Sequence, residues 1–329
     1  MKAIKILAMA ALATAVFASC SNEDGLAQNN YPMDNVVRIM TSVDGMNTRA
    51  SYGNSTDKLK SFGFCIKNAN SEKYTYDNVE ITKEGSNWNP ATQMLWQNST
   101  TAVDILAYAP YQVTTEDASG KVKVFGKADY AFSVQANQNN DEDYSSDLIA
   151  YKKTGFTPGT ELNTYQAVNV AFTHLLSQLN LTIELRDQFN QNNNTVTAGF
   201  VTEVKVNGTI ISSKVDFSAA SIGVQVDDTQ SATAITPETT GFTPAENATD
   251  HAFFNYSAIV IPQTVTAGKF SISFKVDGTE YTWIATSDVN FESGKKHELH
   301  LLVGKDVVQG GTISATSWGN GGTGSLETD

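Results

Sequence analysis

Hydrophobic and polar side chains alternate with a period of two along many short stretches of the chain. In the stretch 36–43, one face of the pattern carries Val37, Ile39, Thr41 and Val43. Alternation of this kind, rich in β-branched and aromatic residues, predicts β-strands. The same pattern predicts further strands at 62–66, 102–110, 121–125, 180–185, 200–211, 257–262, 270–276, 280–285 and 297–303.

Turn signals separate these stretches. Asp277-Gly278 lies between two alternating runs and predicts a β-hairpin, because both residues accept a left-handed backbone. Asn207-Gly208, Glu84-Gly85-Ser86 and Ser119-Gly120 are further turn signals. Helical patterning is poor, and the run 172–179 would form at most a turn or two of helix before an alternating strand. Many short strands at this spacing predict an all-β protein built from antiparallel β-sandwiches.

Polar stretches at 135–143, 189–197 and 229–247 interrupt the pattern and are expected to be exposed loops. We expect a domain boundary near residue 167, after a segment with a Thr157-Pro158-Gly159 turn. The resulting division is an N-terminal sandwich at 50–167 and a C-terminal sandwich at 168–329.

The first residues have the pattern of an export signal. Lys2 and Lys5 precede an apolar run at 6–17, and small residues then lead to Cys20. The run is too short to span a bilayer, so residues 1–19 are expected to be removed and Cys20 to carry lipid. Acyl chains on Cys20 would hold an exported precursor to the outer membrane. The alternative is an ordinary cleaved signal followed by a chance cysteine.

Composition narrows the function classes. The chain has 329 residues and a formal net charge of −13, which disfavours nucleic acid as a partner. Only two cysteines occur, so with lipid on Cys20 no disulfide forms, and Cys65 is expected to pack as a small apolar side chain. Beyond the signal no apolar run is long enough to span a membrane.

Few residues suggest binding chemistry. His297 and His300 lie three apart on an expected strand and so face opposite sides, which makes a poor metal pair. His174 lies among apolar residues and is expected to be a hydrogen-bonded structural histidine. Asp141-Glu142-Asp143 with Asp147 has oxygen ligands suited to Ca²⁺, although a solvated acidic turn is the favoured interpretation.

Two further patterns are set aside. Gly319, Gly321 and Gly324 match a dinucleotide-binding spacing but have no helix to open. Four aromatic residues could form a sugar platform, with core packing as the favoured alternative: Tyr74, Tyr76, Trp88 and Trp96. We therefore expect no catalytic residue, no metal site and no cofactor.

Several segments in order resemble the fimbrillin family, the subunits of lipoprotein-derived (type V) pili. They are Arg38–Gly45 with Thr48–Ala50, Ser146–Tyr151, Val170–Leu179, Ile259–Thr264, Phe291–His297 and the closing Trp318-Gly319. The resemblance implies two transthyretin-like β-sandwich domains in tandem. The chain departs from the family in its short, glycine-rich tail, where stalk subunits carry a long apolar strand.

The leader before Ala50 is the expected assembly element. Only Arg38, Arg49 and Arg186 offer sites to an arginine-specific protease, and Arg49 lies in a polar stretch of small residues that proteases favour. Cutting after Arg49 would release residues 20–49, including the strand of Val37, Ile39, Thr41 and Val43. The vacated groove would accept a strand from another pilin subunit, and head-to-tail insertion makes a filament. The alternative is that Arg49 is an ordinary surface residue of a leader loop.

The expected function is therefore that of a structural and adhesive subunit of a cell-surface pilus. Residues 313–318 alternate weakly before a run of glycines, which makes a thin donor strand and favours a tip or accessory position. A second hypothesis is a permanently anchored surface lipoprotein that binds glycans or host proteins. An enzyme is disfavoured, because no nucleophile–base pair stands out in the sequence.

Overall fold

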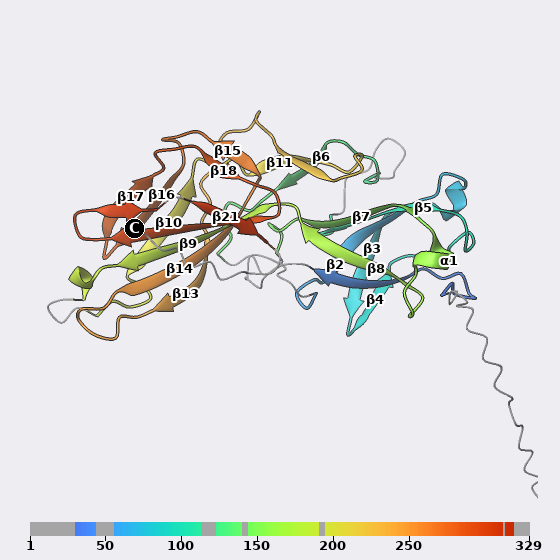
Figure 1. Ribbon diagram of the computed structural model, residues 1–329, viewed down its shortest axis with the longest axis horizontal. Helices are drawn as coiled ribbons and strands as arrows, with labels where there is room; N and C mark the ends of the chain where they lie inside the picture. The colour runs from blue at the N-terminus through green and yellow to red at the C-terminus, as the bar shows by residue number, and fades with distance from the viewer. Residues whose placement is uncertain are drawn as a thin grey trace, which may run out of the picture.

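The computed structural model describes residues 30–43, 56–112, 123–139, 144–190, 195–311 and 313–318. Within these ranges the chain is all-β, as predicted, and Figure 1 shows the strands gathered into two lobes. The exceptions are the short helix α1 (Pro158–Glu161) and 3₁₀ turns at Glu72–Tyr74 and Asp187–Phe189. No helix in the described ranges is both long and apolar enough to cross a bilayer.

A seven-stranded sheet builds the first lobe. Its strands, in spatial order, are β1 (Arg38–Val43), β8 (Ala167–His174), β7 (Ile149–Phe156), β5 (Val103–Ala109), β2 (Ser61–Lys67), β3 (Tyr76–Glu84) and β4 (Asn87–Pro90). Neighbouring strands are antiparallel except β1 and β8, which are parallel. A parallel pair needs a long connection, and here most of the lobe separates the two strands in sequence.

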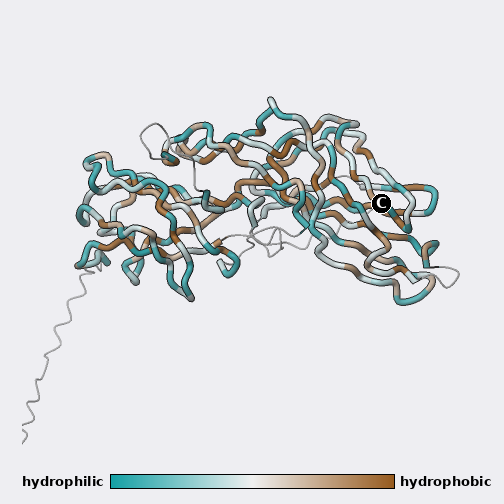
Figure 2. Tube along the Cα trace, turned by 180° about the vertical axis from the view of Figure 1, so that it is seen from behind, coloured by the Kyte–Doolittle hydropathy of each residue, from teal (hydrophilic) through white to brown (hydrophobic). Residues whose placement is uncertain are grey.

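A six-stranded sheet forms one layer of the second lobe. Its strands are β13 (Glu238–Thr243), β14 (Ala252–Val260), β9 (Ser177–Leu185), β19 (Lys295–Val303) and β20 (Val308–Gly310), with β21 (Ser314–Ser317) also paired to β19. Facing strands are β10 (Val201–Asn207), β16 (Ser271–Val276) and β17 (Thr279–Ile284), and a small pair joins β15 (Gln263–Val265) to β18 (Val289–Phe291). Apolar residues follow the strands inside both lobes, and polar residues gather at the turns (Figure 2).

At the junction of the lobes, the order of strands in the sheets does not follow their order along the chain. β8 belongs to the first sheet, so the change from the first sheet to the second follows His174, whereas the sequence placed the boundary near residue 167. β6 (Tyr130–Ser133), from the first half of the chain, pairs with β11 (Ser212–Asp216), which in turn pairs with β12 (Gly223–Val226). The alternation of a strand shows which side chains are buried but does not reveal its partner strand, so the sequence could not place this exchange.

Local turn chemistry agrees with the predictions. Val276 pairs with Thr279 across Asp277 and Gly278, and both turn residues have positive φ, which confirms the hairpin. The β3–β4 hairpin turns at Gly85, which also has a positive φ. The run 172–179 contains no helix, because β8 ends at His174 and β9 begins at Ser177.

Three strand and loop predictions were wrong in part. The described residues of 121–125 form no strand, because the amides of Val124 and Phe125 donate to the Asp77 carboxylate and not to a neighbouring strand. The expected strand 200–211 ends at Asn207, where Gly208 adopts a positive φ. The expected loop 229–247 contains β13, whose polar composition suits an exposed sheet edge.

Candidate functional site: the first strand and its groove

β1 and the residue before it send alternate side chains into the core of the first lobe. Val37, Ile39 and Val43 are 3%, 8% and 6% exposed, whereas Met40 is 41% exposed. They belong to a buried cluster together with Phe62 and other apolar residues of the lobe. At about 1.5–3 kcal/mol for each buried aliphatic side chain, three of them are a substantial part of the stability of a small core.

β1 pairs with the sheet through one edge. Its register with β8 runs from Arg38 opposite Ala167 to Val43 opposite Phe172. On the other edge, the Val37 amide donates to the Met94 carbonyl at 3.0 Å, just before the strand begins. From Ile39 to Val43, no strand in the described ranges pairs with that outer edge. For β1 to leave, the ladder with β8 must break, together with the short bridge of Val36 to Leu95 just before the strand.

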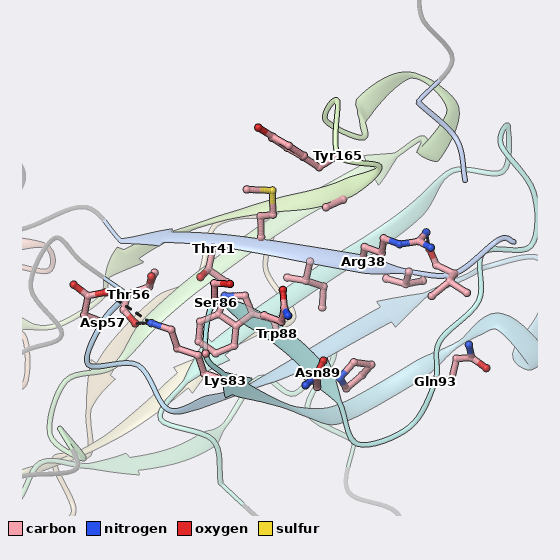
Figure 3. A pocket seen from close by; sticks show the side chains of 18 residues that line it. Arg38, Thr41, Thr56, Asp57, Lys83, Ser86, Trp88, Asn89, Gln93 and Tyr165 are labelled. Atoms are coloured by element: carbon pink, nitrogen blue, oxygen red, sulfur yellow. Dashed lines mark hydrogen bonds and ion pairs between the residues drawn. The ribbon is translucent and has the colours of Figure 1, made fainter. Parts of the chain in front are cut away.

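A groove of about 920 Å³ follows the outer edge of β1, and the β3–β4 hairpin forms its opposite wall. Figure 3 shows Thr41 of β1 facing Ser86 and Trp88 of the hairpin. Trp88 packs edge-on against Phe62, with ring centroids 5.1 Å apart. The wall opposite β1 is therefore anchored to the core by its own aromatic contact.

Lys83 of β3 connects the hairpin wall of the groove to Thr56 and Asp57, which follow the expected leader in the sequence. Its Nζ donates to the Thr56 carbonyl at 2.8 Å and lies 3.8 Å from Asp57 Oδ1, as Figure 3 shows. These contacts do not involve β1. The segment beginning at Thr56 therefore keeps its own attachment to the lobe when β1 is absent.

Two of the three arginines are held by contacts. Arg38 Nη2 lies 2.6 Å from Asp34 Oδ2, and this bond lowers the pKa of Asp34 and raises that of Arg38. Arg186 donates to Gln309 Oε1 at 2.7 Å. The predicted cleavage position Arg49-Ala50 and the predicted lipidation residue Cys20 lie outside the described residues.

The last strand, β21, is held mainly by the residue that follows it. Residues 315–317 are exposed, but Trp318 is buried and donates its amide to the Gly294 carbonyl at 3.0 Å. Its ring stacks on His174, with centroids 4.2 Å apart and an interplanar angle of 3°. Trp318 therefore fastens the C-terminal strand to the junction where β8 passes into β9.

We expect Trp318→Ala to release β21 from β19. Since no residue of β21 is buried, Trp318→Ala leaves this strand with its ladder to β19 but without a buried side chain beside it. Hydrogen exchange at 314–317 should rise at least tenfold, with little change in β14 at the centre of the sheet. Trp283→Ala, which removes a ring near Gly310, is the matched control and should leave exchange at 314–317 unchanged. Protection retained at 314–317 in Trp318→Ala would contradict this anchoring role.

The histidine predictions are confirmed. His297 is buried, and its burial lowers its pKa, whereas His300 on the same strand is exposed. His174 is a buried structural residue whose Nδ1 lies 2.9 Å from Asp147 Oδ1. Asp147 is itself fully buried, so it takes no part in a solvated acidic turn, and the residues 141–143 lie outside the described ranges.

Cys65 and the two tryptophans considered as possible binding residues contribute to packing. Cys65 is fully buried and donates to Asp77 Oδ1 at 3.3 Å, and burial raises the pKa of its thiol. Trp96 is buried and stacks on Phe156, which confirms core packing at that position. Trp88 is half-buried in the groove wall described above. In the described part of the chain, no group of three or more His, Cys, Asp or Glu side chains has an arrangement that could hold a metal ion.

Sequence reasoning missed the contacts that join the lobes. Lys152 of β7 donates to the carbonyls of Phe217 and Ala219 at 2.7 and 2.5 Å, and burial lowers its pKa. Gln138 pairs its side-chain amide with both backbone groups of Ile259, at 2.8 and 2.7 Å. Neither residue has a local sequence signal, because its partners lie far away along the chain.

Comparison with solved structures shows a similar fold in three proteins of Bacteroides. A candidate cell adhesion protein from Bacteroides uniformis is 18% identical, with 87% of this chain and 99% of that chain covered and a TM-score of 0.58. A second one, from Bacteroides ovatus, is 13% identical, with 86% and 97% covered and a TM-score of 0.59. A fimbrial protein from Bacteroides vulgatus is 17% identical, with 86% and 99% covered and a TM-score of 0.55.

A search of curated protein sequences gave no match. The sequence profile described as Fimbrillin-like matches residues 48–318, which is most of the chain. The match extends from the end of the leader through both lobes to Trp318. The chain therefore belongs to the fimbrillin-like family.

Proposed function

We propose that this protein is a structural and adhesive subunit of a cell-surface pilus, assembled by donor-strand exchange, and that it has no enzymatic role. Family membership supports the pilus assignment. The observation that carries the assembly scheme is the state of β1. This strand and Val37 just before it place three side chains in the core of the first lobe, yet the strand itself pairs along only one edge.

In this scheme the chain is exported and lipidated at Cys20, which holds the precursor to the outer membrane. An arginine-specific protease then cuts between Arg49 and Ala50. The pairing of β1 with β8 at Arg38 and the bond from the Arg186 amide to the Val303 carbonyl support Arg49 as the preferred position, because proteases cut most readily where the backbone is exposed and not hydrogen-bonded.

Release of β1 would expose the edge of β8 and the apolar pockets of Val37, Ile39 and Val43. An extended segment of a second pilin subunit can restore both, with backbone hydrogen bonds for affinity and alternate side chains for register. The hairpin wall and the Lys83 contacts to Thr56 and Asp57 would keep the slot in shape during the exchange. Repeated head-to-tail insertion makes a filament.

The C-terminal strand favours a tip or accessory position. β21 has no buried residue of its own, and Trp318 just after it is engaged with His174. A donor strand needs alternate apolar side chains to fill a core slot, and Ala315 is a weak candidate for that purpose. A tip subunit must accept a strand but need not donate one.

Mass spectrometry of filaments sheared from cells tests the maturation step. We expect peptides that begin at Ala50 and none from residues 20–49. The membrane-bound precursor from the same cells is the internal control and should begin at Cys20 with lipid attached. Filaments whose subunits keep residues 20–49 would refute the scheme.

A further inference from the structure

One side chain of β1, that of Thr41, has a hydroxyl oxygen in an energetically unfavourable environment. The hydroxyl oxygen of Thr41 is shielded from solvent and has no hydrogen-bond partner in the described part of the chain. Thr41 lies on the same face as Ile39 and Val43, and although its half-buried side chain also lines the groove, its hydroxyl oxygen is itself shielded from solvent. A buried hydroxyl without a partner loses its bonds to water and gains nothing in exchange.

We propose that position 41 is the specificity-determining position of the slot. Because of Thr41, the slot binds β1 less tightly than it would bind a strand with an aliphatic residue at this position. The slot therefore selects an incoming strand that carries a branched aliphatic residue at this register. This inference rests on the proposed strand exchange and gives a reason why a donor strand would replace β1 and not the reverse.

The other core positions of the strand offer no such gain. Val37, Ile39 and Val43 are aliphatic and buried, so another aliphatic residue there would change the fit but not remove an unpaired polar atom. At position 41, valine has nearly the shape of threonine and lacks the hydroxyl. The register places this side chain opposite Val170 of β8, whose own side chain is fully buried.

The groove adds room at the same position. Thr41 is one of its lining residues, and Figure 3 shows this side chain directed toward Ser86 and Trp88 across the open space. A residue one methylene longer than valine, such as isoleucine, can therefore extend into the groove without displacing the core. Ile39 also lines the groove, but its side chain is 8% exposed and belongs to the buried cluster, and Val43 does not line the groove.

The first test uses the intact chain and needs no exchange. In urea unfolding, Thr41→Val should raise the equilibrium constant for folding about tenfold, which corresponds to about 1.4 kcal/mol. Thr202→Val is the matched control, because it makes the same change at an exposed position of β10 and should alter the constant less than about twofold. Equal effects of the two variants would overturn the proposal.

The second test uses the full chain after cutting at Arg49 with an arginine-specific protease. Fluorescent peptides with the sequence 36–43 carry either Thr or Val at position 41. We expect the Val peptide to displace β1 and to bind with a Kd about tenfold lower than the Thr peptide. Equal binding of the two peptides would overturn the selectivity of position 41.

The two tests separate this inference from the proposed function. If Thr41→Val stabilises the intact chain but neither peptide enters the cut chain, the preference of the pocket is upheld and strand exchange is refuted. If the peptides enter but Thr41→Val does not stabilise the intact chain, exchange is upheld and the role of Thr41 is refuted.

Discussion

Arg49→Ala is expected to abolish filament formation and leave a monomeric, lipidated precursor in the outer membrane. The reason is that β1 would remain covalently joined to the body and would return to its slot at a very high effective concentration. A strand from another subunit could then not compete for the edge of β8 or for the pockets of Ile39 and Val43. Electron microscopy of sheared material and the mass of the membrane-bound chain provide the measurements.

Two control variants sharpen this experiment. Arg49→Lys should also block maturation if the protease is specific for arginine, but should permit it if any basic residue suffices. Arg186→Ala removes an arginine that is bound to Gln309 and should leave both cleavage and filaments intact. Normal filaments from Arg49→Ala would show that assembly does not depend on release of the leader.

Ile39→Ala is expected to produce the largest change in stability among single substitutions in β1. Ile39 is the larger of the two buried side chains of β1, and truncating a buried isoleucine costs about 2–5 kcal/mol because a cavity remains. For a chain of this size the melting temperature should fall by about 3–8 °C. Scanning calorimetry of the intact chain provides the measurement.

The same substitution should speed the departure of β1 after cleavage at Arg49. Loss of about 2 kcal/mol of binding corresponds to an approximately 30-fold weaker hold on the strand. Met40→Ala is the matched control, because Met40 is the adjacent residue and points outward. A melting temperature that falls equally in both variants would mean that β1 does not fill the core in solution.

Nine of the twenty-one strands in the described residues were predicted, because their signal is local. The alternation at 37–43, 271–276 and 279–284 identified both the strand and the buried face, and Asp277-Gly278 identified the hairpin. Other strands, such as β3, β7 and β13, were not predicted, and the predicted strand at 121–125 does not form because its backbone groups have partners other than a neighbouring strand. The amides of Val124 and Phe125 bond to the distant side chain of Asp77, which no local pattern could reveal.

The candidate site was predictable in its residues but not in its geometry. The sequence identified the inward face of β1, and the structure buries Val37, Ile39 and Val43 as expected. That β1 pairs in parallel with β8, and through one edge only, depends on a strand more than a hundred residues away. The alternation placed Thr41 on the inward face together with the aliphatic residues. That its hydroxyl has no hydrogen-bond partner among the described residues depends on the surrounding structure, which the alternation does not reveal.

The order of amino acids by itself determined which segments are extended, which side of each is apolar and where tight turns occur, because these properties depend on neighbours within a few residues. Only the tertiary structure decided that β8 belongs to the first sheet, that β6 joins β11, and that Trp318 closes over His174. Strand partners are chosen by the packing of whole faces against each other, and many pairings satisfy the same alternation. The single paired edge of β1 is therefore a property of its place in the sheet and not of its own six residues.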